Sequence, residues 1–207
     1  GMPGTIAVGH VRYSTTGHPS RENAQPVCIT HCKGNLAITH NGNLVNAGKL
    51  RRQIELDGGI FRSSSDTEVL AYTIVRERLK CGSIEQAVLH AMGKIEGAYS
   101  LAIMSPRKLI AARDPHGFRP LCIGKLPEGR GWVVSSETCG LDIVGAEYVR
   151  DVEPGEIVTI DRRGLRSSDY SMYKRHLMCA MEYIYFARPD SDIEGCNVHA
   201  YRKESGR

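Results

Sequence analysis

The stretch from Leu36 to Asn46, LAITHNGNLVN, most constrains the fold, because an apolar strand pattern meets polar and flexible residues there. Leu36, Ile38 and His40 alternate with small or polar residues, which predicts a half-buried strand. Asn41-Gly42 then interrupts the alternation with a dipeptide typical of two-residue hairpin turns. The same pair also suits an oxyanion, since an asparagine amide and an unshielded glycine N–H are donors that approach one closely. A plain turn and a catalytic corner therefore both fit this stretch.

Polar motifs on either side of this stretch point to a known class. GHVRYST occupies residues 9–15 and SSSDTE occupies residues 63–68, and the three motifs in this order resemble the class II, N-terminal-nucleophile glutamine amidotransferases. Within that class the chain resembles the amidophosphoribosyltransferase family, on the later runs RDPHGFRPL (113–121), SSETC (135–139) and MEYIYFARPDS (181–191). The resemblance covers essentially all 207 residues.

The resemblance implies a role for five residues in binding and activating glutamine. Arg12 would hold the α-carboxylate, which a planar guanidinium grips with two hydrogen bonds, and Thr15 would assist it. Asp66 would bind the α-ammonium, and Asn41 with Gly42 would form the oxyanion hole. By residue type alone, Arg12 also fits a surface cation, and Asp66 fits a favourable charge at a helix N-terminus.

Two further residues carry implied roles with equally simple alternatives. Tyr13 resembles the residue that couples the glutamine site to a second domain, but it also fits core packing. Cys179 resembles a ligand of the four-iron cluster that some family members carry, although a buried thiol is the favoured interpretation. The resemblance implies no cofactor for the glutaminase half and Mg²⁺ for the phosphoribosyltransferase domain.

The resemblance also predicts the fold and the domains. The fold class expected is α+β, an N-terminal-nucleophile sandwich of antiparallel sheets flanked by helices (αββα), incomplete at the N-terminus. Residues 1–170 would form a partial amidotransferase domain, and residues 171–207 its end and the approach to an absent phosphoribosyltransferase domain. The class attacks glutamine with an N-terminal cysteine, whereas this sequence begins Gly1-Met2-Pro3. We therefore expect this chain alone to be inactive, as a piece shortened at both ends.

The amino-acid composition limits the classes of partner that this protein is expected to bind. Hydrophobic residues make up 41% and charged residues 24%, and no apolar run reaches the length that spans a membrane. The net charge of +4 comes from short basic groups without interleaved aromatics, which argues against nucleic-acid binding. The seven irregularly spaced cysteines fit a reducing cytosol. We expect a cytoplasmic protein that binds glutamine, engages no membrane or nucleic acid, and forms a homo-oligomer at full length.

Hydrophobic spacing and capping signals predict the remaining elements. Asn46 is expected to cap a helix ending at Gly58-Gly59, and Ser65 to Glu68 fits a capping box for a helix to about Lys80. A third helix begins at Ser83, with Gln86 completing its box. Also predicted are strands at Thr5–Val11, Ala98–Met104, Leu109–Arg113, Leu121–Gly124, Gly131–Ser135 and Cys179–Ala187, a turn at Pro154-Gly155 within Val149–Ile160, a hairpin at Arg162-Arg163-Gly164 and a helix from Asn197.

Two other functions stay open from the sequence. A non-catalytic glutamine-binding regulatory module would need no nucleophile, and the domain could also belong to another class II amidotransferase. An in-frame upstream cysteine in the source DNA would favour the enzyme over the regulatory module.

Overall fold

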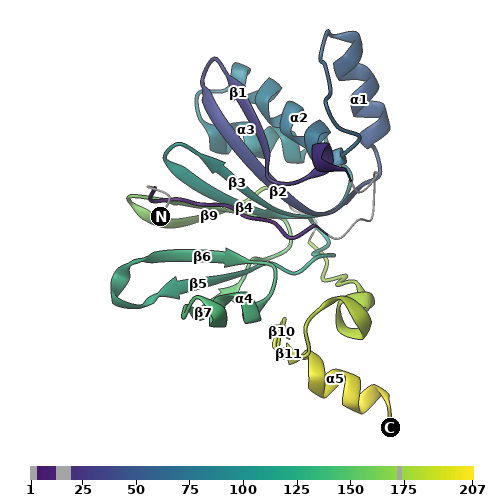
Figure 1. Ribbon diagram of the computed structural model, residues 1–207, viewed down its shortest axis with the longest axis vertical. Coiled ribbons are helices and arrows are strands. Elements are labelled where there is room, and N and C mark those ends of the chain that lie inside the picture. Colours follow the sequence, from purple (N-terminus) through teal and green to yellow (C-terminus); the bar gives the residue numbers. More distant parts are fainter. Residues whose placement is uncertain (1–3, 13–19, 172–173) are drawn as a thin grey trace.

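The computed structural model describes residues 4–12, 20–171 and 174–207, so Tyr13 and Thr15 lie outside the described residues. Two antiparallel sheets form the centre of the molecule, with helices on their outer faces (Figure 1). The six-stranded sheet has the order β1 (Val27–His31), β2 (Gly34–Leu44), β3 (Gly97–Ser105), β4 (Lys108–Arg113), β8 (Glu156–Asp161) and β9 (Gly164–Asp169). The three-stranded sheet has the order β6 (Gly131–Ser135), β5 (Cys122–Leu126) and β7 (Glu147–Asp151).

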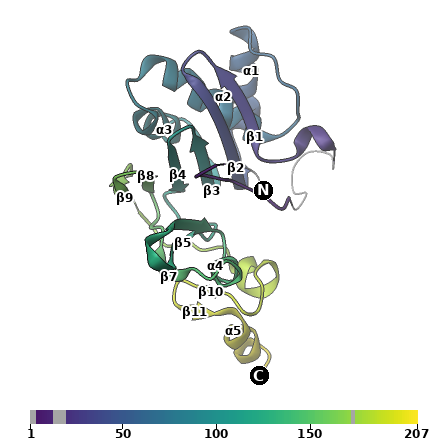
Figure 2. The ribbon, with the colours of Figure 1, turned by 60° about the vertical axis from the view of Figure 1, so that its left-hand side comes forward.

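Helices cover each sheet on the side away from the other sheet. On the six-stranded sheet lie α1 (Ala47–Leu56), α2 (Asp66–Lys80) and α3 (Ile84–Met92), whereas α4 (Thr138–Ile143) contacts β6 and β7. Figure 2 shows the two sheets as separate layers, with the C-terminal segment beyond the smaller one. That segment holds the π-helical turn η3 (Glu182–Phe186), the short strands β10 (Asp192–Ile193) and β11 (Cys196–Asn197), and α5 (Val198–Ser205). The predicted αββα fold class is confirmed.

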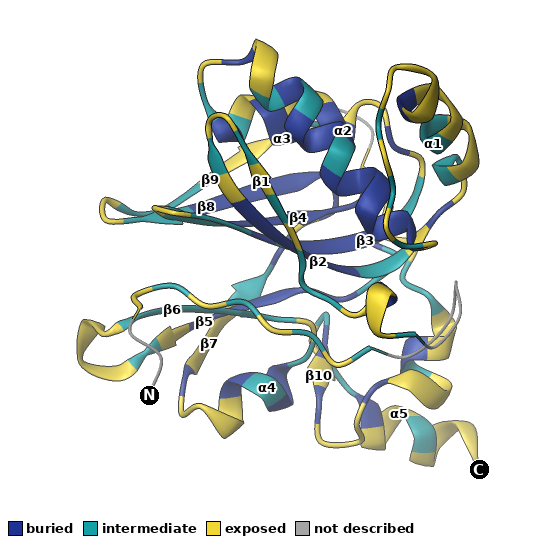
Figure 3. Ribbon diagram, turned by 45° about the horizontal axis from the view of Figure 1, so that its top comes forward, coloured by how far each residue is buried: buried dark blue, intermediate teal, exposed yellow. Residues whose placement is uncertain are grey.

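Two apolar clusters account for this layering. The larger packs Ile38, Leu101 and Ile103 of the six-stranded sheet against Leu70 and Ile74 of α2, all fully buried. The smaller lies between the sheets and contains Ala111, Leu121, Ile123, Val152 and Val158. Residues 36–40 of β2 are buried without a break, because side chains alternate between a face that serves the helices and a face that serves the second sheet. Figure 3 shows the resulting buried faces of α2 and β3.

The N-terminus of α2 is fixed by polar contacts because its first turn is buried. Ser65 caps the helix by accepting a hydrogen bond from the Thr67 N–H at 3.2 Å. The predicted capping box requires Glu68 to accept a hydrogen bond from the Ser65 N–H, and this bond is not formed. The Glu68 carboxylate instead accepts bonds from the backbone N–H groups of Arg62 and Ser63, because these donors in the preceding loop otherwise have no partner. Glu68 therefore holds the loop before the helix.

Three other local predictions are wrong, and one turn is confirmed. Asn41-Gly42 is no turn, since β2 continues through it and pairs with β3 over eight positions from Ala37 to Leu44. Residues 5–11 belong to no sheet. The Pro154-Gly155 turn is confirmed, and it joins β7, which pairs with β5, to β8, which pairs with β4. Residues 182–186 form a helical turn instead of a strand.

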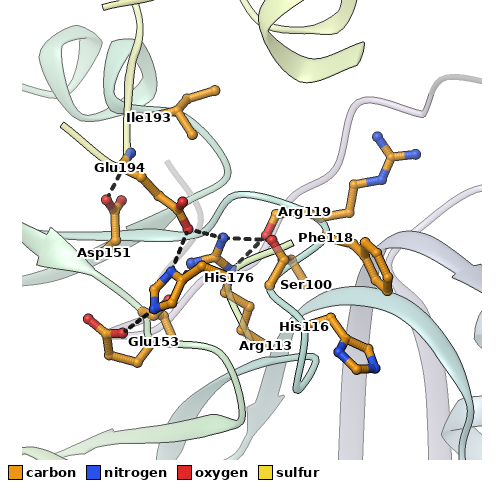
Figure 4. A network of polar contacts seen from close by, with 12 residues as sticks. Ser100, Arg113, His116, Phe118, Arg119, Asp151, Glu153, His176, Ile193 and Glu194 are labelled. Atoms are coloured by element: carbon orange, nitrogen blue, oxygen red, sulfur yellow. Dashed lines mark hydrogen bonds and ion pairs between the residues drawn. The ribbon is translucent and has the colours of Figure 1, made fainter. Parts of the chain in front are cut away.

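A buried arginine ties the sheets to the C-terminal segment (Figure 4). Arg113 ends β4 with its side chain 1% exposed, and its guanidinium donates to the Arg119, Val152 and Gly117 carbonyls at 2.7–2.9 Å. Its remaining contact is an ion pair with Glu194 at 2.8 Å, in the turn between β10 and β11. A buried charge needs such partners to offset its lost hydration.

No helix among the described residues is long and apolar enough to cross a membrane. All seven cysteines lie in the described part of the chain and are free thiols.

Candidate active site

A hollow of about 790 Å³ opens between the two sheets, and four of the predicted site residues line it. Arg12 comes from the N-terminal segment, Asn41 and Gly42 from β2, and Asp66 from the start of α2. They are separated by up to 54 positions in the sequence, counted from residue 12 to residue 66. The fold thus brings a cation, an anion and an amide into one site.

The Gly42 N–H points to the outer edge of β2. Its partner in the ladder is Tyr99, which donates its N–H to Asp114 Oδ2 at 3.2 Å and accepts the Asp114 N–H at 2.9 Å. Both backbone groups of Tyr99 thus face away from β2. Opposite residues of an antiparallel pair exchange both bonds or neither. Gly42 therefore directs its N–H away from β3, beyond the end of β1 pairing at Ile38.

Neighbouring donors along this edge already have partners. The His40 N–H donates to the Gln25 side chain at 2.7 Å, and the Leu44 N–H donates to Asp66 at 3.0 Å. Gly42 lies between them, and its N–H makes no bond to any described residue. It is an open donor in the wall of the hollow, as an oxyanion hole requires.

The Asn41 side chain lies on the face of β2 opposite to that of His40, and it is half-buried. Side chains alternate along a strand, so Asn41 shares a face with Ala37 and Thr39 and looks toward the second sheet. Its amide and the neighbouring Gly42 N–H therefore approach the hollow from adjacent positions.

No side chain fits at Gly42. A Cβ there would lie 2.0 Å from the Ala98 carbonyl oxygen and 3.0 Å from His40 Nε2, and the φ of +147° is one that L-residues rarely adopt. Glycine is required here by close packing against β3 and by backbone conformation, in place of the turn predicted from the sequence.

Asp66 is buried, with 9% of its surface exposed, and joins α2 to β2. Its Oδ2 accepts from the Leu44 N–H at 3.0 Å, while Oδ1 lies 3.7 Å from His40 Nδ1. Burial acts to raise the pKa of this carboxyl, but His40 and the Leu44 and Thr67 amides outweigh it, so the pKa is lowered. Asp66 is therefore held as an anion that faces the hollow.

His40 lies between the two parts of the site. Its Nδ1 lies 3.4 Å from Thr67 Oγ1 as well as near Asp66, and its Nε2 lies 3.4 Å from the Ala98 carbonyl. The ring is 4% exposed and lies against both the β3 backbone and the first turn of α2.

The far end of the hollow is built from the second sheet and from η3. Glu182, which is 4% exposed, accepts from Arg119 at 2.6 Å, and the same guanidinium lies 5.0 Å from the Phe186 ring centre. Burial raises the pKa of Glu182, although Arg119 acts in the opposite direction. These residues carry a second charged pair into the same hollow.

Sequence reasoning missed several of these residues. His40 was treated as a strand residue alone, although its place directly before Asn41 was a usable signal. Gln25, Arg119 and Glu182 gave no signal, because their contacts depend on segments 15 to 63 positions away.

Cys139 also lines this hollow, whereas Cys179 does not. Burial is the largest cause that raises the pKa of the Cys139 thiol. Cys179 is half-buried, and its N–H bonds to the Phe118 carbonyl. Among the described residues no group of three His, Cys, Asp or Glu side chains is placed to hold a metal ion. Cys179 therefore belongs to no such group among the described residues.

Comparison with known proteins identifies the class. The model of the glutamine amidotransferase domain family matches residues 10–142, and the chain belongs to this family. Its relatives include the amidophosphoribosyltransferase of Bacillus subtilis (strain 168), which is 47% identical over 207 residues, covering 100% of this chain and 43% of that protein. The amidophosphoribosyltransferase of Methanocaldococcus jannaschii is 46% identical over 219 residues, covering 99% of this chain and 46% of that protein.

A solved structure agrees with these sequence relatives. The glutamine phosphoribosylpyrophosphate amidotransferase from B. subtilis, complexed with ADP and GMP, matches with a TM-score of 0.86 at 46% identity. The match covers 95% of this chain and 42% of that chain. The chain thus spans less than half the length of these relatives. The resemblance seen in the sequence motifs is confirmed.

Proposed function

We propose that this chain is the glutamine-binding part of an amidophosphoribosyltransferase. Residues 1–170 would form the amidotransferase domain, and residues 171–207 would lead into a phosphoribosyltransferase domain. The observation that carries the proposal is the meeting of Arg12, Asp66 and the open Gly42 N–H in one hollow. Opposite charges match the two ends of an amino-acid zwitterion, and a backbone donor matches the amide that reacts.

Each residue would act at one part of glutamine. Arg12 would bind the α-carboxylate, with Thr15 assisting, and Asp66 would bind the α-ammonium. Attack on the side-chain carboxamide places negative charge on its oxygen, and the Asn41 side chain and Gly42 N–H would receive that charge. Both donors belong to a paired strand, so little reorganisation would be needed as the charge develops.

His40 would act as a positioning residue. It lies near Asp66 on one side and near the Ala98 carbonyl of β3 on the other. Loss of the ring would leave the Asp66 carboxylate held by Leu44 and Thr67 alone. We therefore assign His40 to the alignment of the ammonium-binding group with the oxyanion corner.

The nucleophile is not supplied by the cysteines described around this site. A thiolate is the reactive form of cysteine, and the raised pKa of Cys139 keeps that thiol protonated at neutral pH. The class uses an N-terminal cysteine whose own amine carries the proton. We therefore expect the chain to bind glutamine, with none of the described cysteines around the site attacking it.

In the whole enzyme, ammonia released from glutamine would displace pyrophosphate from phosphoribosyl pyrophosphate and give 5-phosphoribosylamine for purine synthesis. Mg²⁺ would serve the phosphoribosyltransferase domain, and the glutamine half would need no cofactor. Tyr13 would couple the two domains. We further propose a homo-oligomer in the cytoplasm, a compartment with which seven free thiols agree.

Calorimetric titration of the chain with glutamine, together with an assay for glutamate release, tests the proposal. We expect saturable binding that discriminates against glutamine lacking its α-amine, and no glutamate above background. Absence of binding would overturn the assigned site. Glutamate release by the 207 residues themselves would overturn the assignment of the nucleophile to another segment.

A further inference from the structure

A second hollow, of about 430 Å³, shares no lining residue with the glutamine site. Three turns meet around it: the β1–β2 turn, the β3–β4 turn and the connection between α2 and α3. Its volume falls within the range of small-molecule sites, which is about 300–1,000 Å³. It lies at the ends of elements whose other parts build the first site.

The charge of this second hollow is one-sided. Its lining includes Lys33, Arg78, Arg107 and Lys108, and no aspartate or glutamate. His31 also lines this hollow. Burial lowers the pKa of its imidazole most, and repulsion from Arg78 and Lys33 lowers that pKa further. A concave surface with one sign of charge concentrates ions of the opposite sign.

Two of the four cations are engaged and two have free donors. Lys33 donates to the carbonyls of Arg78, Leu79 and Cys81 at 3.0–3.2 Å, which neutralises the carbonyl end of α2. Lys108 forms an ion pair with Glu85 at the start of α3.

Arg78 and Arg107 remain available to a ligand. Arg78 uses Nη1 for the Cys81 carbonyl at 2.8 Å, and this is its one side-chain bond to the described residues. Arg107 is exposed and makes no bond to any described residue. The Ser83 hydroxyl accepts from the Gln86 N–H and helps to lower the pKa of the Glu85 carboxyl, so it is not counted as a ligand. Two guanidinium groups with unused donors therefore line a hollow whose charged lining residues are all cations.

We propose that this second hollow binds a phosphate group, carried by a small phosphorylated molecule or present as inorganic phosphate. Guanidinium groups match phosphate oxygens in geometry and charge. Arg107 is the principal ligand, Arg78 is the second, and Lys33 supplies charge without a direct bond. The site is separate from glutamine chemistry and does not depend on the function proposed above.

Amide NMR of the chain, titrated with inorganic phosphate and then with glycerol 3-phosphate, tests this site. We expect saturable shifts at Gly82, Ser83 and Arg107 that chloride at equal ionic strength does not produce. Tighter binding of the ester identifies a phosphorylated small molecule as the ligand class, and equal binding identifies phosphate itself. Shifts that fail to saturate, or that chloride reproduces, would overturn the proposal.

Arg107→Gln is the decisive variant, because this side chain makes no bond whose loss would unfold the protein. We expect it to weaken phosphate binding about tenfold, since it removes a charged hydrogen-bond donor. Arg107→Glu should abolish binding. Arg52→Gln, an exposed arginine on α1, is the matched control and should bind like the parent chain. Equal binding by the Arg107→Gln and Arg52→Gln variants would overturn the proposal.

Discussion

The Leu44 N–H donates to Asp66 Oδ2 at 3.0 Å, so the carboxylate assigned to the substrate ammonium also closes the end of a strand. One side chain therefore has a structural and a binding role. Substitutions that separate charge from hydrogen bonding can distinguish these roles, because asparagine keeps an acceptor for Leu44 and lacks the negative charge.

Asp66→Asn should lower glutamine affinity at least about tenfold with little change in stability, since the charge on the ammonium site is lost. Asp66→Ala should lower affinity as much and also cost about 1–3 kcal/mol of unfolding free energy, because the buried Leu44 N–H loses its acceptor. Calorimetry and urea unfolding measure the two effects. The control is Asp142→Asn, on the exposed end of α4. Parent-like glutamine affinity in Asp66→Asn would remove Asp66 from the binding site.

His40→Ala should act on substrate binding more than on the chemical step. In an active amidotransferase that carries this domain, we expect a KM about tenfold higher and a smaller change in kcat, because Asp66 loses its neighbour. His40→Asn retains one hydrogen-bonding group and should recover part of the loss. A change confined to kcat would contradict a positioning role and place the ring at the reacting atoms.

Asn41→Ala tests the oxyanion hole in the same active protein. Removing one donor to a developing oxyanion raises the barrier by roughly 3 kcal/mol, or about a hundredfold in rate. Glutamine affinity should change much less. Asn35→Ala, at the exposed start of β2, serves as the control. A normal glutaminase rate in Asn41→Ala would exclude this amide from the reaction.

Gly42→Ala and Gly48→Ala should change stability in opposite directions. The new methyl at position 42 would meet the Ala98 carbonyl oxygen at 2.0 Å, whereas position 48 in α1 has open space. We expect a loss on the order of 3 kcal/mol at position 42, from overpacking and backbone strain together. At position 48 we expect a gain of about 0.5–1 kcal/mol from helix propensity. Equal melting temperatures would refute the close approach of β2 and β3.

Acid should weaken the fold through Glu156. Burial acts to raise the pKa of this carboxyl, but Arg150, Ser167 and the Glu153 amide outweigh it and lower the pKa. A lowered pKa means that the contribution to stability is complete above the ordinary value of 4.5 and declines as the pH falls below it. Glu156→Gln should therefore flatten this part of the curve of unfolding free energy against pH. A parallel curve for the variant would assign the acid sensitivity to other carboxyls.

Local sequence signals predicted the elements whose own residues decide them. The α3 helix was found because Ser83 and the apolar stripe that follows are sufficient to define it. Of the two interpretations of Asn41-Gly42, the turn is wrong, since turn propensity loses to a continuous ladder with β3. The run from Glu182 to Phe186 has aromatic and β-branched residues typical of a strand. Its helical turn depends on Glu182 meeting Arg119, 63 positions away, which no local pattern reports.

The same limit applies to the site. Its charged and amide residues could be named from motifs, because their types match the parts of glutamine. Their arrangement could not, because the direction of the Gly42 N–H is set by how Tyr99 bonds to Asp114 in a neighbouring strand. His40 was missed for a related reason: its contacts come from the fold on both sides of the ring.

Arg113 makes the stability of distant parts of the chain depend on one another. Its partners lie before β5, after β7 and in the turn between β10 and β11, and its charge is almost fully shielded from water. If the C-terminal turn alone came loose, the buried guanidinium would lose its ion pair with Glu194, which is costly. Opening of the C-terminal segment alone therefore costs free energy at the buried Arg113, in the centre of the domain. The two sheets and the segment that follows them should lose their structure in one cooperative event, and a protease should find few stable intermediates to cut.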